Sequence, residues 1–179
     1  MEMNDFFIKE LKNGVLTLWM DQANKKVNVI SLDLIDSFNQ LMQEVDSNPE
    51  IKSVVLISKK KDFIAGANIE DFKAEKKGDF QAITRNGHQV LGKIEKSKKP
   101  VVAAIHGTCF GGGLEIALAC SARIASNSSS TKIALPEVKL GLLPGGGGTQ
   151  RLPRLIGVQN ALNMMLTGKN IYAYKAKKI

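Results

Sequence analysis

The sequence predicts a mixed α/β fold with a mainly parallel β-sheet, and three observations predict it. Short apolar segments alternate with longer segments whose apolar residues recur at helical spacing. This order is typical of βαβ units, in which helices cover a mainly parallel sheet. Glycine-rich segments follow expected strands or open expected helices. The 179 residues are 44% hydrophobic and 23% charged, which suits a folded core and excludes a disordered chain.

The first half of the chain supplies two expected strands and one expected helix. Residues 14–20 are rich in apolar and β-branched side chains and predict a strand. Ser31 is a suitable N-cap for a helix that Asn48-Pro49 ends. Residues 51–58 predict a short buried strand. The apolar residues at helical spacing in that helix are Leu32, Ile35, Phe38, Leu41, Met42 and Val45.

The same alternation continues in the second half. A helical pattern ends near the lysines before Pro100, residues 101–105 predict another buried strand, and residues 114–119 predict a compact apolar helix. There is no low-complexity linker and no internal repeat, so residues 1–179 are expected to form one domain. The helical pattern before Pro100 runs through Phe80, Ile83, Val90, Leu91 and Ile94.

The charged residues are unevenly distributed. Residues 1–95 contain 15 acidic and 13 basic side chains, whereas residues 96–179 contain two acidic and 12 basic ones. Of the 25 basic residues 21 are Lys, and only 6% of the chain is aromatic, which argues against a nucleic-acid-binding surface. A small molecule that carries phosphates is compatible with the basic excess. The two acids of the second half are Glu115 and Glu137.

Other sites and classes find no support in the sequence. No apolar run approaches the ~18 residues of a membrane-spanning helix. Cys109 and Cys120 lack metal-ligand spacing, so we expect two apolar, reduced thiols and no metal site. We expect His106 to be a packed or hydrogen-bonded structural residue. Residues 128–130 are expected to form a polar loop, without the neighbours of a serine hydrolase.

The order of the three glycine segments along the chain is more informative than any one segment alone. None has the spacing of a Walker P-loop or of a dinucleotide-binding loop. The middle segment leads into the apolar helix 114–119, whose first N–H groups lack intrahelical partners and are suited to hold a developing oxyanion. The three segments span residues 63–68, 111–115 and 142–149.

Glu115 and Glu137 are candidates for proton transfer. Glu115 falls in the first turn of the expected helix, where a carboxylate can equally serve to complement the helix dipole. Glu137 follows Leu135-Pro136 in an apolar loop, with no expected helix to serve. Two carboxylates near one pair of polarising N–H groups are typical of a general acid/base couple.

Three separated motifs occur in one order along the chain: Ala65-Gly66-Ala67-Asn68-Ile69, then Ala104-Ile105-His106-Gly107 through Gly111-Gly112-Gly113-Leu114-Glu115, then Leu135-Pro136-Glu137 through Gly145-Gly146-Gly147-Gly148-Thr149-Gln150-Arg151. With these motifs the sequence resembles the crotonase, or enoyl-CoA hydratase/isomerase, superfamily. Within it, the chain is most similar to the amino-terminal module of the multifunctional fatty-acid oxidation α subunits. The resemblance implies the crotonase (ClpP-like) fold, with stacked ββα units and truncated C-terminal helices.

The resemblance also implies a role for each matching position. The backbone N–H groups of Ala67 and Gly112 are expected to form the oxyanion hole for a thioester oxygen. Glu115 is expected mainly to activate water and Glu137 mainly to deliver a proton, while Gly145 helps to place the water. Further acyl-CoA contacts are expected at Ala65, Ile69, Gly111 and Pro144.

The activity that the resemblance implies is the reversible hydration of 2-trans-enoyl-CoA to 3-hydroxyacyl-CoA in fatty-acid β-oxidation. Two alternatives stay open: 3-enoyl-CoA isomerisation or another crotonase-type reaction, and a noncatalytic CoA- or nucleotide-binding fragment. A phosphate binder gains nothing from carboxylates beside its anion site, which favours an enzyme. Two positions depart from the family pattern, since Asn68 replaces a common Asp and Glu70 replaces a common Lys.

Partners and cofactors follow from the same resemblance. Fatty-acid oxidation α subunits continue into an NAD-dependent 3-hydroxyacyl-CoA dehydrogenase region, so NAD would belong there and no cofactor is expected in this chain. A crotonase domain also normally continues with further helices that complete the acyl pocket and the trimer or domain contacts, so the domain at residues 1–179 is expected to be incomplete at its C-terminus. The expected partners are acyl-CoA, further copies in a trimer-type homo-oligomer, and a thiolase β subunit for the full-length protein. The expected location is the bacterial cytoplasm, with the mitochondrial matrix as the alternative.

Overall fold

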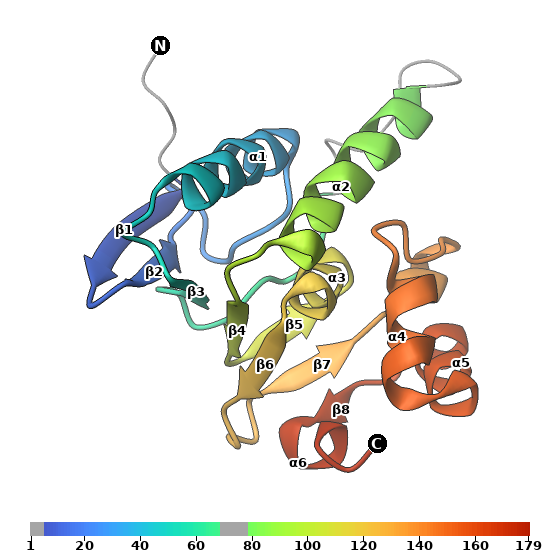
Figure 1. Cartoon of the computed structure of the whole chain (residues 1–179). Helices are drawn as coiled ribbons and strands as arrows, with labels where there is room; N and C mark the ends of the chain where they lie inside the picture. Colours follow the sequence, from blue (N-terminus) through green and yellow to red (C-terminus); the bar gives the residue numbers. More distant parts are fainter. Residues whose placement is uncertain (1–5, 69–78) are drawn as a thin grey trace.

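The computed structural model describes residues 6–68 and 79–179, which fold around two β-sheets (Figure 1). In the larger sheet the strand order is β1-β2-β3-β4-β6; β1 and β2 are antiparallel and every other neighbouring pair is parallel. The strands of this sheet are β1 (Phe7–Lys12), β2 (Val15–Met20), β3 (Ser53–Ser58), β4 (Val101–Ile105) and β6 (Ala122–Ala125).

A smaller sheet has the order β5-β7-β8, with β5 and β7 parallel and β7 and β8 antiparallel. Its strands are β5 (Thr108–Phe110), β7 (Lys132–Ala134) and β8 (Ile171–Tyr172). The helices are α1 (Leu32–Ser47), α2 (Asp79–Lys96), α3 (Gly112–Ala119), the 3₁₀ helix η1 (Glu137–Leu140), α4 (Gly148–Ile156), α5 (Val158–Thr167) and α6 (Ala173–Ala176).

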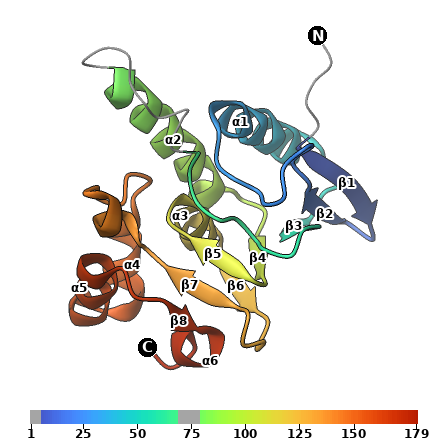
Figure 2. The same ribbon diagram turned by 180° about the vertical axis from the view of Figure 1, so that it is seen from behind.

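The helices pack in sequence order, because α1 contacts α2, α2 contacts α3, α3 contacts α4, and α4 contacts α5. Apart from Glu115, helix α3 is apolar on every side, and it is buried from Gly113 to Ala119, as is typical of a helix in the interior of a protein. Both views place α4 and α5 at the opposite end of the molecule from β1 and β2 (Figure 1 and Figure 2). The central helix α3 therefore links the two ends of the fold.

Helix α1 shows how the local sequence specifies an element. The Ser31 side chain caps it by accepting a hydrogen bond from the Leu34 N–H at 3.2 Å. The apolar stripe predicted from the sequence packs into the core, and only its first member, Leu32, is exposed. Phe38 from this stripe meets Phe7 edge to face, with the ring centroids 4.9 Å apart.

Most of the elements expected from the sequence are confirmed. The strands predicted over residues 14–20, 51–58 and 101–105 correspond to β2, β3 and β4, and the two long helical patterns correspond to α1 and α2. One expectation was wrong. Glu137 does not lie in a loop but opens η1, because the chain makes a tight 3₁₀ turn directly after Pro136.

The described residues contain neither a membrane-spanning helix nor a metal-binding cluster. None of their helices has both the length and the apolar character to cross a bilayer. Residues 6–68 and 79–179 also contain no group of three or more His, Cys, Asp or Glu side chains arranged to hold a metal ion. The predicted structural role of His106 agrees with its contact, since its Nε2 atom lies 2.8 Å from the Lys60 carbonyl oxygen.

Candidate active site

A cavity of about 620 Å³ opens between the α1–α2 layer and the segments that flank η1. Its walls are mainly apolar, and its size is ordinary for a small-molecule site. Among the described residues, Glu115 and Glu137 are the two carboxylates that line it. Its apolar lining comes from Ile30, Leu34, Ile35, Phe38, Val90, Leu91, Phe110, Ile116, Leu140, Leu142 and Leu143, among others.

Glu115 is held deep in the fold by α3 and is only 3% exposed. Its Oε1 atom accepts two backbone hydrogen bonds, from the Gly146 N–H at 2.8 Å and from the Gly148 N–H at 2.7 Å. Burial raises the pKa of Glu115, and these two bonds, together with the electrostatic effects of nearby His88 and Arg151, oppose that rise. The carboxylate is therefore buried but specifically supported.

The glycine loop before α4 is shaped around this carboxylate. Gly148 is the first residue of α4, and the N-cap Gly147 has no side chain with which to cap it. Glu115 reaches across from α3 and takes the place of a capping side chain, at the positive end of the α4 dipole. A Cβ atom at Gly146 would lie 2.7 Å from Glu115 Oε2, so this close approach requires glycine.

Glu137 has a contrasting environment at the start of η1. Its Oε2 atom is buried and has no hydrogen-bond partner among the described residues. Burial raises the pKa of Glu137 to about 7; its own backbone N–H lowers the pKa and the neighbouring Glu115 raises it further. A carboxyl group with this pKa gives up and takes back protons near neutral pH, as a general acid or base must.

The two backbone donors expected at Ala67 and Gly112 both line the cavity. Ile30 pairs with Ala67 in a parallel bridge: the Ile30 N–H donates to Gly66 O at 2.9 Å, and the Asn68 N–H donates to Ile30 O at 2.8 Å. In such a bridge the N–H of the central residue, Ala67, points to the opposite side.

Gly112 supplies the second donor because it is the first residue of α3, where N–H groups have no intrahelical acceptor. In the described part of the chain, no protein group accepts a hydrogen bond from the N–H of Ala67 or of Gly112. A Cβ atom at Gly112 would lie 2.5 Å from Ile30 Cδ1. Ile30 therefore packs against one donor and pairs with the residue that carries the other.

A buried asparagine, which the sequence analysis did not single out, fixes the segment that carries Ile30. Asn28 is 2% exposed. Its Oδ1 accepts from the Gln22 N–H at 3.1 Å, and its Nδ2 donates to Ser58 Oγ at 2.9 Å. Its backbone carbonyl also accepts from the Ala65 N–H at 2.9 Å. Asn28 thus joins β2, β3 and the strand-like segment that presents Ala67.

The other site residues expected from the sequence differ in whether they reach the cavity. Ala65, Gly111 and Gly145 line the same cavity. Pro144 is buried beside Gly145 but is not part of the cavity lining. Ile69 lies outside the described residues.

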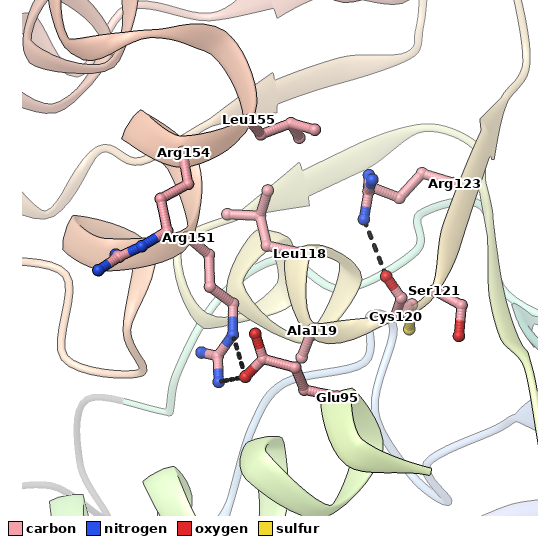
Figure 3. A pocket seen from close by; sticks show the side chains of 9 residues that line it. All are labelled: Glu95, Leu118, Ala119, Cys120, Ser121, Arg123, Arg151, Arg154 and Leu155. Atoms are coloured by element: carbon pink, nitrogen blue, oxygen red, sulfur yellow. Dashed lines mark hydrogen bonds and ion pairs between the residues drawn. The ribbon is translucent and has the colours of Figure 1, made fainter. Parts of the chain in front are cut away.

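A second hollow, of about 280 Å³, lies where the C-terminal ends of α2 and α3 meet α4 (Figure 3). Its polar wall carries three arginines and one acid, and Arg151 forms an ion pair with Glu95 there. Arg123 donates to the Ala117 and Cys120 carbonyls at the end of α3. The lining residues are Glu95, Leu118, Ala119, Cys120, Ser121, Arg123, Arg151, Arg154 and Leu155.

The chemistry of the larger cavity follows from its groups. Two N–H groups without protein acceptors can polarise a carbonyl oxygen and stabilise the enolate that forms from it. Two carboxyl groups of raised pKa line the same cavity. They can transfer protons to and from the carbon chain that is attached to that carbonyl group. The apolar wall excludes water from the remainder of a bound ligand.

Comparison with known proteins agrees with this chemistry. Residues 10–179 match the family model described as enoyl-CoA hydratase/isomerase. The fatty acid oxidation complex subunit alpha of Shewanella sp. strain W3-18-1 is 48% identical over 176 residues, which is 97% of this chain and 25% of that protein. The Shewanella amazonensis protein of the same name is 47% identical over the same shares. The chain thus spans about a quarter of the length of these curated relatives.

Solved structures give the same family. An enoyl-CoA hydratase of Geobacillus kaustophilus superposes with a TM-score of 0.91 at 34% identity, over 97% of this chain and 65% of that one. The enoyl-CoA hydratase of Bacillus anthracis gives 0.88 at 30% identity, over 97% and 67%. DspI of Pseudomonas aeruginosa gives 0.91 at 29% identity, over 100% and 72%. The predicted crotonase-type fold is therefore confirmed.

Proposed function

The chain belongs to the enoyl-CoA hydratase/isomerase family, and on that premise we propose that it hydrates 2-trans-enoyl-CoA reversibly to 3-hydroxyacyl-CoA. The observation that carries the proposal is the convergence of Glu115, Glu137 and the N–H groups of Ala67 and Gly112 on one apolar cavity. The reaction adds water across a double bond and transfers no electrons, so it calls for no redox cofactor.

The thioester oxygen of the substrate lies between the N–H groups of Ala67 and Gly112. These two donors withdraw electron density from the conjugated system and make the β-carbon electrophilic. They also stabilise the enolate oxygen that forms when water attacks. Loss of one such donor typically costs ~3–4 kcal/mol of transition-state stabilisation.

The carboxyl groups of Glu115 and Glu137 carry out the proton transfers. Glu115, supported as a carboxylate by two N–H groups and the N-terminus of α4, takes a proton from the attacking water as the C–O bond forms. Glu137, with its pKa near 7, then delivers a proton to the α-carbon and completes the C–H bond. Gly145, on the same wall, helps to place the water. Because the two carboxyls interact, their titrations belong to the pair.

An isomerase activity is the second candidate, and the shared cavity favours it. A 3-enoyl-CoA loses a proton from its α-carbon to give a dienolate, which the same two N–H groups stabilise. Return of a proton at the γ-carbon then gives the 2-enoyl product. Since both carboxyls line the cavity, either one can carry the proton between the two carbons. A noncatalytic CoA-binding role leaves this pair of acids without a purpose.

The direct test follows the loss of enoyl-thioester absorbance with a short 2-enoyl-CoA. We expect Glu115→Gln and Glu137→Gln each to lower kcat by about 10²- to 10⁴-fold, the usual contribution of a general acid or base. The exposed Glu50 supplies the matched control, and Glu50→Gln keeps the wild-type rate. Wild-type turnover in both site variants contradicts the proposed chemistry.

The wider role is also a proposal. The curated relatives are named subunits of a fatty acid oxidation complex, so we propose a place in bacterial, cytoplasmic fatty-acid β-oxidation, with a thiolase β subunit as partner of the full-length protein. Exposed apolar side chains on α5 and before α4, such as Leu143, Val158 and Leu166, favour assembly with further copies. Light scattering of the purified chain tests this, and a monomer at all concentrations contradicts it.

A further inference from the structure

The glycine turn at residues 146–148, which binds Glu115, makes hydrogen bonds to two different side chains. On the cavity side, the N–H groups of Gly146 and Gly148 donate to Glu115 Oε1. On the opposite side, the Arg151 guanidinium donates from Nη1 to the Gly146 carbonyl at 2.9 Å. Glu115 and Arg151 therefore act on the same three-residue turn from α3 and from α4.

The positions of these bonds along the backbone show what Arg151 controls. The N–H of Gly146 belongs to the peptide unit before Gly146, and the N–H of Gly148 belongs to the peptide unit after Gly147. The carbonyl that Arg151 holds belongs to the peptide unit between them. Because peptide units are planar, fixing the middle unit restricts the orientation of both donors to Glu115.

The second edge of the Arg151 guanidinium group is held by Glu95. Its Nε and Nη2 atoms donate to Glu95 Oε2 on α2, at 3.2 and 2.9 Å (Figure 3). A Cβ atom at Gly147 would lie 2.5 Å from Arg151 Nη1, so the guanidinium rests directly on the loop. Only a planar guanidinium presents donors at both edges at once, so lysine cannot replace these contacts.

We propose that Arg151, anchored by Glu95, is a positioning residue for Glu115: it holds the Gly146–Gly148 turn so that both N–H groups stay aimed at the carboxylate. This inference rests on the proposed function for its consequence in catalysis. Its structural part, the aim of two N–H groups, is measurable without turnover.

Electrostatics adds to the geometry. Among the described residues, the titratable and charged groups that face Glu115 are His88 from α2, Arg151 from α4 and Glu137 from η1. The positive charge of Arg151 favours the ionised carboxylate, as do the two N–H groups that it positions. Without Arg151 the pKa of Glu115 rises, so the acidic limb of the pH–rate profile moves to higher pH.

Arg154 offers a matched control. It lines the same hollow as Arg151 (Figure 3), one turn further along α4. Among the described residues, its side chain donates hydrogen bonds only to Gln150 of its own helix. Arg154→Gln therefore removes the same charge from the same hollow without touching the glycine turn.

The experiment compares Arg151→Gln, Arg151→Lys, Glu95→Gln and Arg154→Gln in the full chain. The first readout is the pair of Gly146 and Gly148 amide proton signals in ¹H–¹⁵N NMR spectra across a pH titration. The second is the pH dependence of kcat and KM with a short 2-enoyl-CoA. Thermal unfolding of each variant identifies those that do not fold.

We expect Arg151→Gln to shift both amide signals towards those of weaker hydrogen bonds and to raise the pH of the acidic limb. It lowers kcat by about ten- to a hundredfold, as small misplacements of catalytic groups do, while KM changes by less than about twofold. Arg151→Lys does not restore the signals, and Glu95→Gln gives a smaller change in the same direction. Arg154→Gln matches the wild type.

The inference is overturned if the two amide signals and the acidic limb of Arg151→Gln coincide with those of Arg154→Gln. If Arg151→Gln does not fold, wild-type amide signals in both Arg151→Lys and Glu95→Gln overturn it. The amide signals also separate the two proposals. Shifted signals in a chain whose wild type has no hydratase activity reject the proposed function and keep the positioning role.

Discussion

Glu115 and Glu137 share one cavity but differ in what surrounds their oxygens. Glu115 Oε1 accepts two backbone hydrogen bonds, which favour its charged form. Glu137 has a buried oxygen without a partner among the described residues, which favours the neutral form. Environments that separate the behaviour of two carboxyls are typical of paired acid and base catalysts. The difference supports the proposed roles, with Glu115 as the base and Glu137 as the acid.

The pH dependence of hydration tests this assignment. Glu137 must be protonated to deliver its proton, and its pKa lies at about 7. The rate is therefore expected to fall tenfold per pH unit above about 7. Glu115 must be ionised, and burial raises its pKa from the ordinary 4.5, so the rate also falls on the acidic side. A profile of kcat/KM between pH 4 and 9 checks both limbs, and a rate that stays level above pH 7 contradicts the role of Glu137.

The Gly146→Ala variant tests the fit between the glycine turn and Glu115. The added methyl would lie 2.7 Å from Glu115 Oε2, so the carboxylate or the turn must move. We expect kcat to fall about 10²-fold, as for other misplaced catalytic groups, with a smaller change in KM. Gly92→Ala in α2 is the control: its methyl would meet nothing within 4 Å, and it stabilises the helix by about 0.5–1 kcal/mol. Equal rates in the two variants would rule out the steric account.

At the scale of elements, the proposed polarising N–H groups of Ala67 and Gly112 depend on a short segment between β2 and α1. Ile30 pairs with Ala67 and packs on Gly112. Asn28 fixes that segment through its side chain, which also reaches the Met20 and Phe63 carbonyls at 3.3 Å. The separation between two N–H groups from distant parts of the chain is thus set by one buried polar network.

We therefore expect Asn28→Ala to impair folding and catalysis together. It leaves the buried Ser58 hydroxyl without this partner and loosens the segment that carries Ile30. The cost is about 2–4 kcal/mol in the free energy of unfolding, measured by urea denaturation, with a fall in kcat at temperatures where the variant is folded. The exposed Asn160 of α5 donates from Nδ2 to the Ile156 carbonyl at the end of α4. This bond is open to water, so Asn160→Ala should change the free energy of unfolding by less than about 1 kcal/mol. Equal stability in the two variants contradicts this view of Asn28.

Elements with strong local patterns could be predicted from the sequence, and short elements could not. The apolar stripe and the Ser31 cap made α1 predictable, and continuous apolar runs did so for β3 and β4. Strands β7 and β8 have three and two residues, so their pairing is decided by distant partners rather than by their own sequence. The role of Arg151 was missed for the same reason, because its partner Glu95 lies 56 residues away.

The candidate site shows the same division. Glu115 and Glu137 stood out because they are the two acids of a basic half, and the motifs around them assign a reaction by resemblance. Asn28 gave no such signal, since a single polar residue between Val27 and Val29 could equally be exposed. The four hydrogen-bond partners of its side chain come from three separate segments, and only the folded chain brings them together.

At the scale of the whole molecule, the site combines parts that the fold brings from both of its ends. The α1–α2 side supplies a large part of the apolar wall, η1 supplies Glu137, and the segment that follows η1 supplies the glycine turn. Helix α3 lies between them and carries Glu115. The stability of the molecule therefore includes the cost of burying two acids for the sake of the site.

Because the Glu137 carboxyl group is partly buried, we expect the free energy of unfolding to depend on pH through the titration of Glu137. Its pKa is about 7 in the folded chain against an ordinary 4.5, so the folded state holds a proton that the unfolded state releases between these values. Folding is thus favoured below about pH 4.5, and this contribution is lost as the pH rises through about 7. A full conversion would give about 3 kcal/mol, which partial solvent screening reduces to about 1–2 kcal/mol.

The Glu137→Gln variant removes this contribution because glutamine does not titrate. Urea unfolding of the wild type and the variant at pH 4.5 and pH 8 measures the difference. From pH 4.5 to pH 8, we expect the free energy of unfolding of the variant to rise by about 1–2 kcal/mol relative to that of the wild type. A stability difference that is the same at both pH values does not affect this comparison. Both histidines are common to the two proteins, so their titration cancels in this comparison. Glu50→Gln, at an exposed position, should follow the wild type at both pH values. A constant gap between Glu137→Gln and the wild type would show that burial does not raise the pKa of Glu137 in solution.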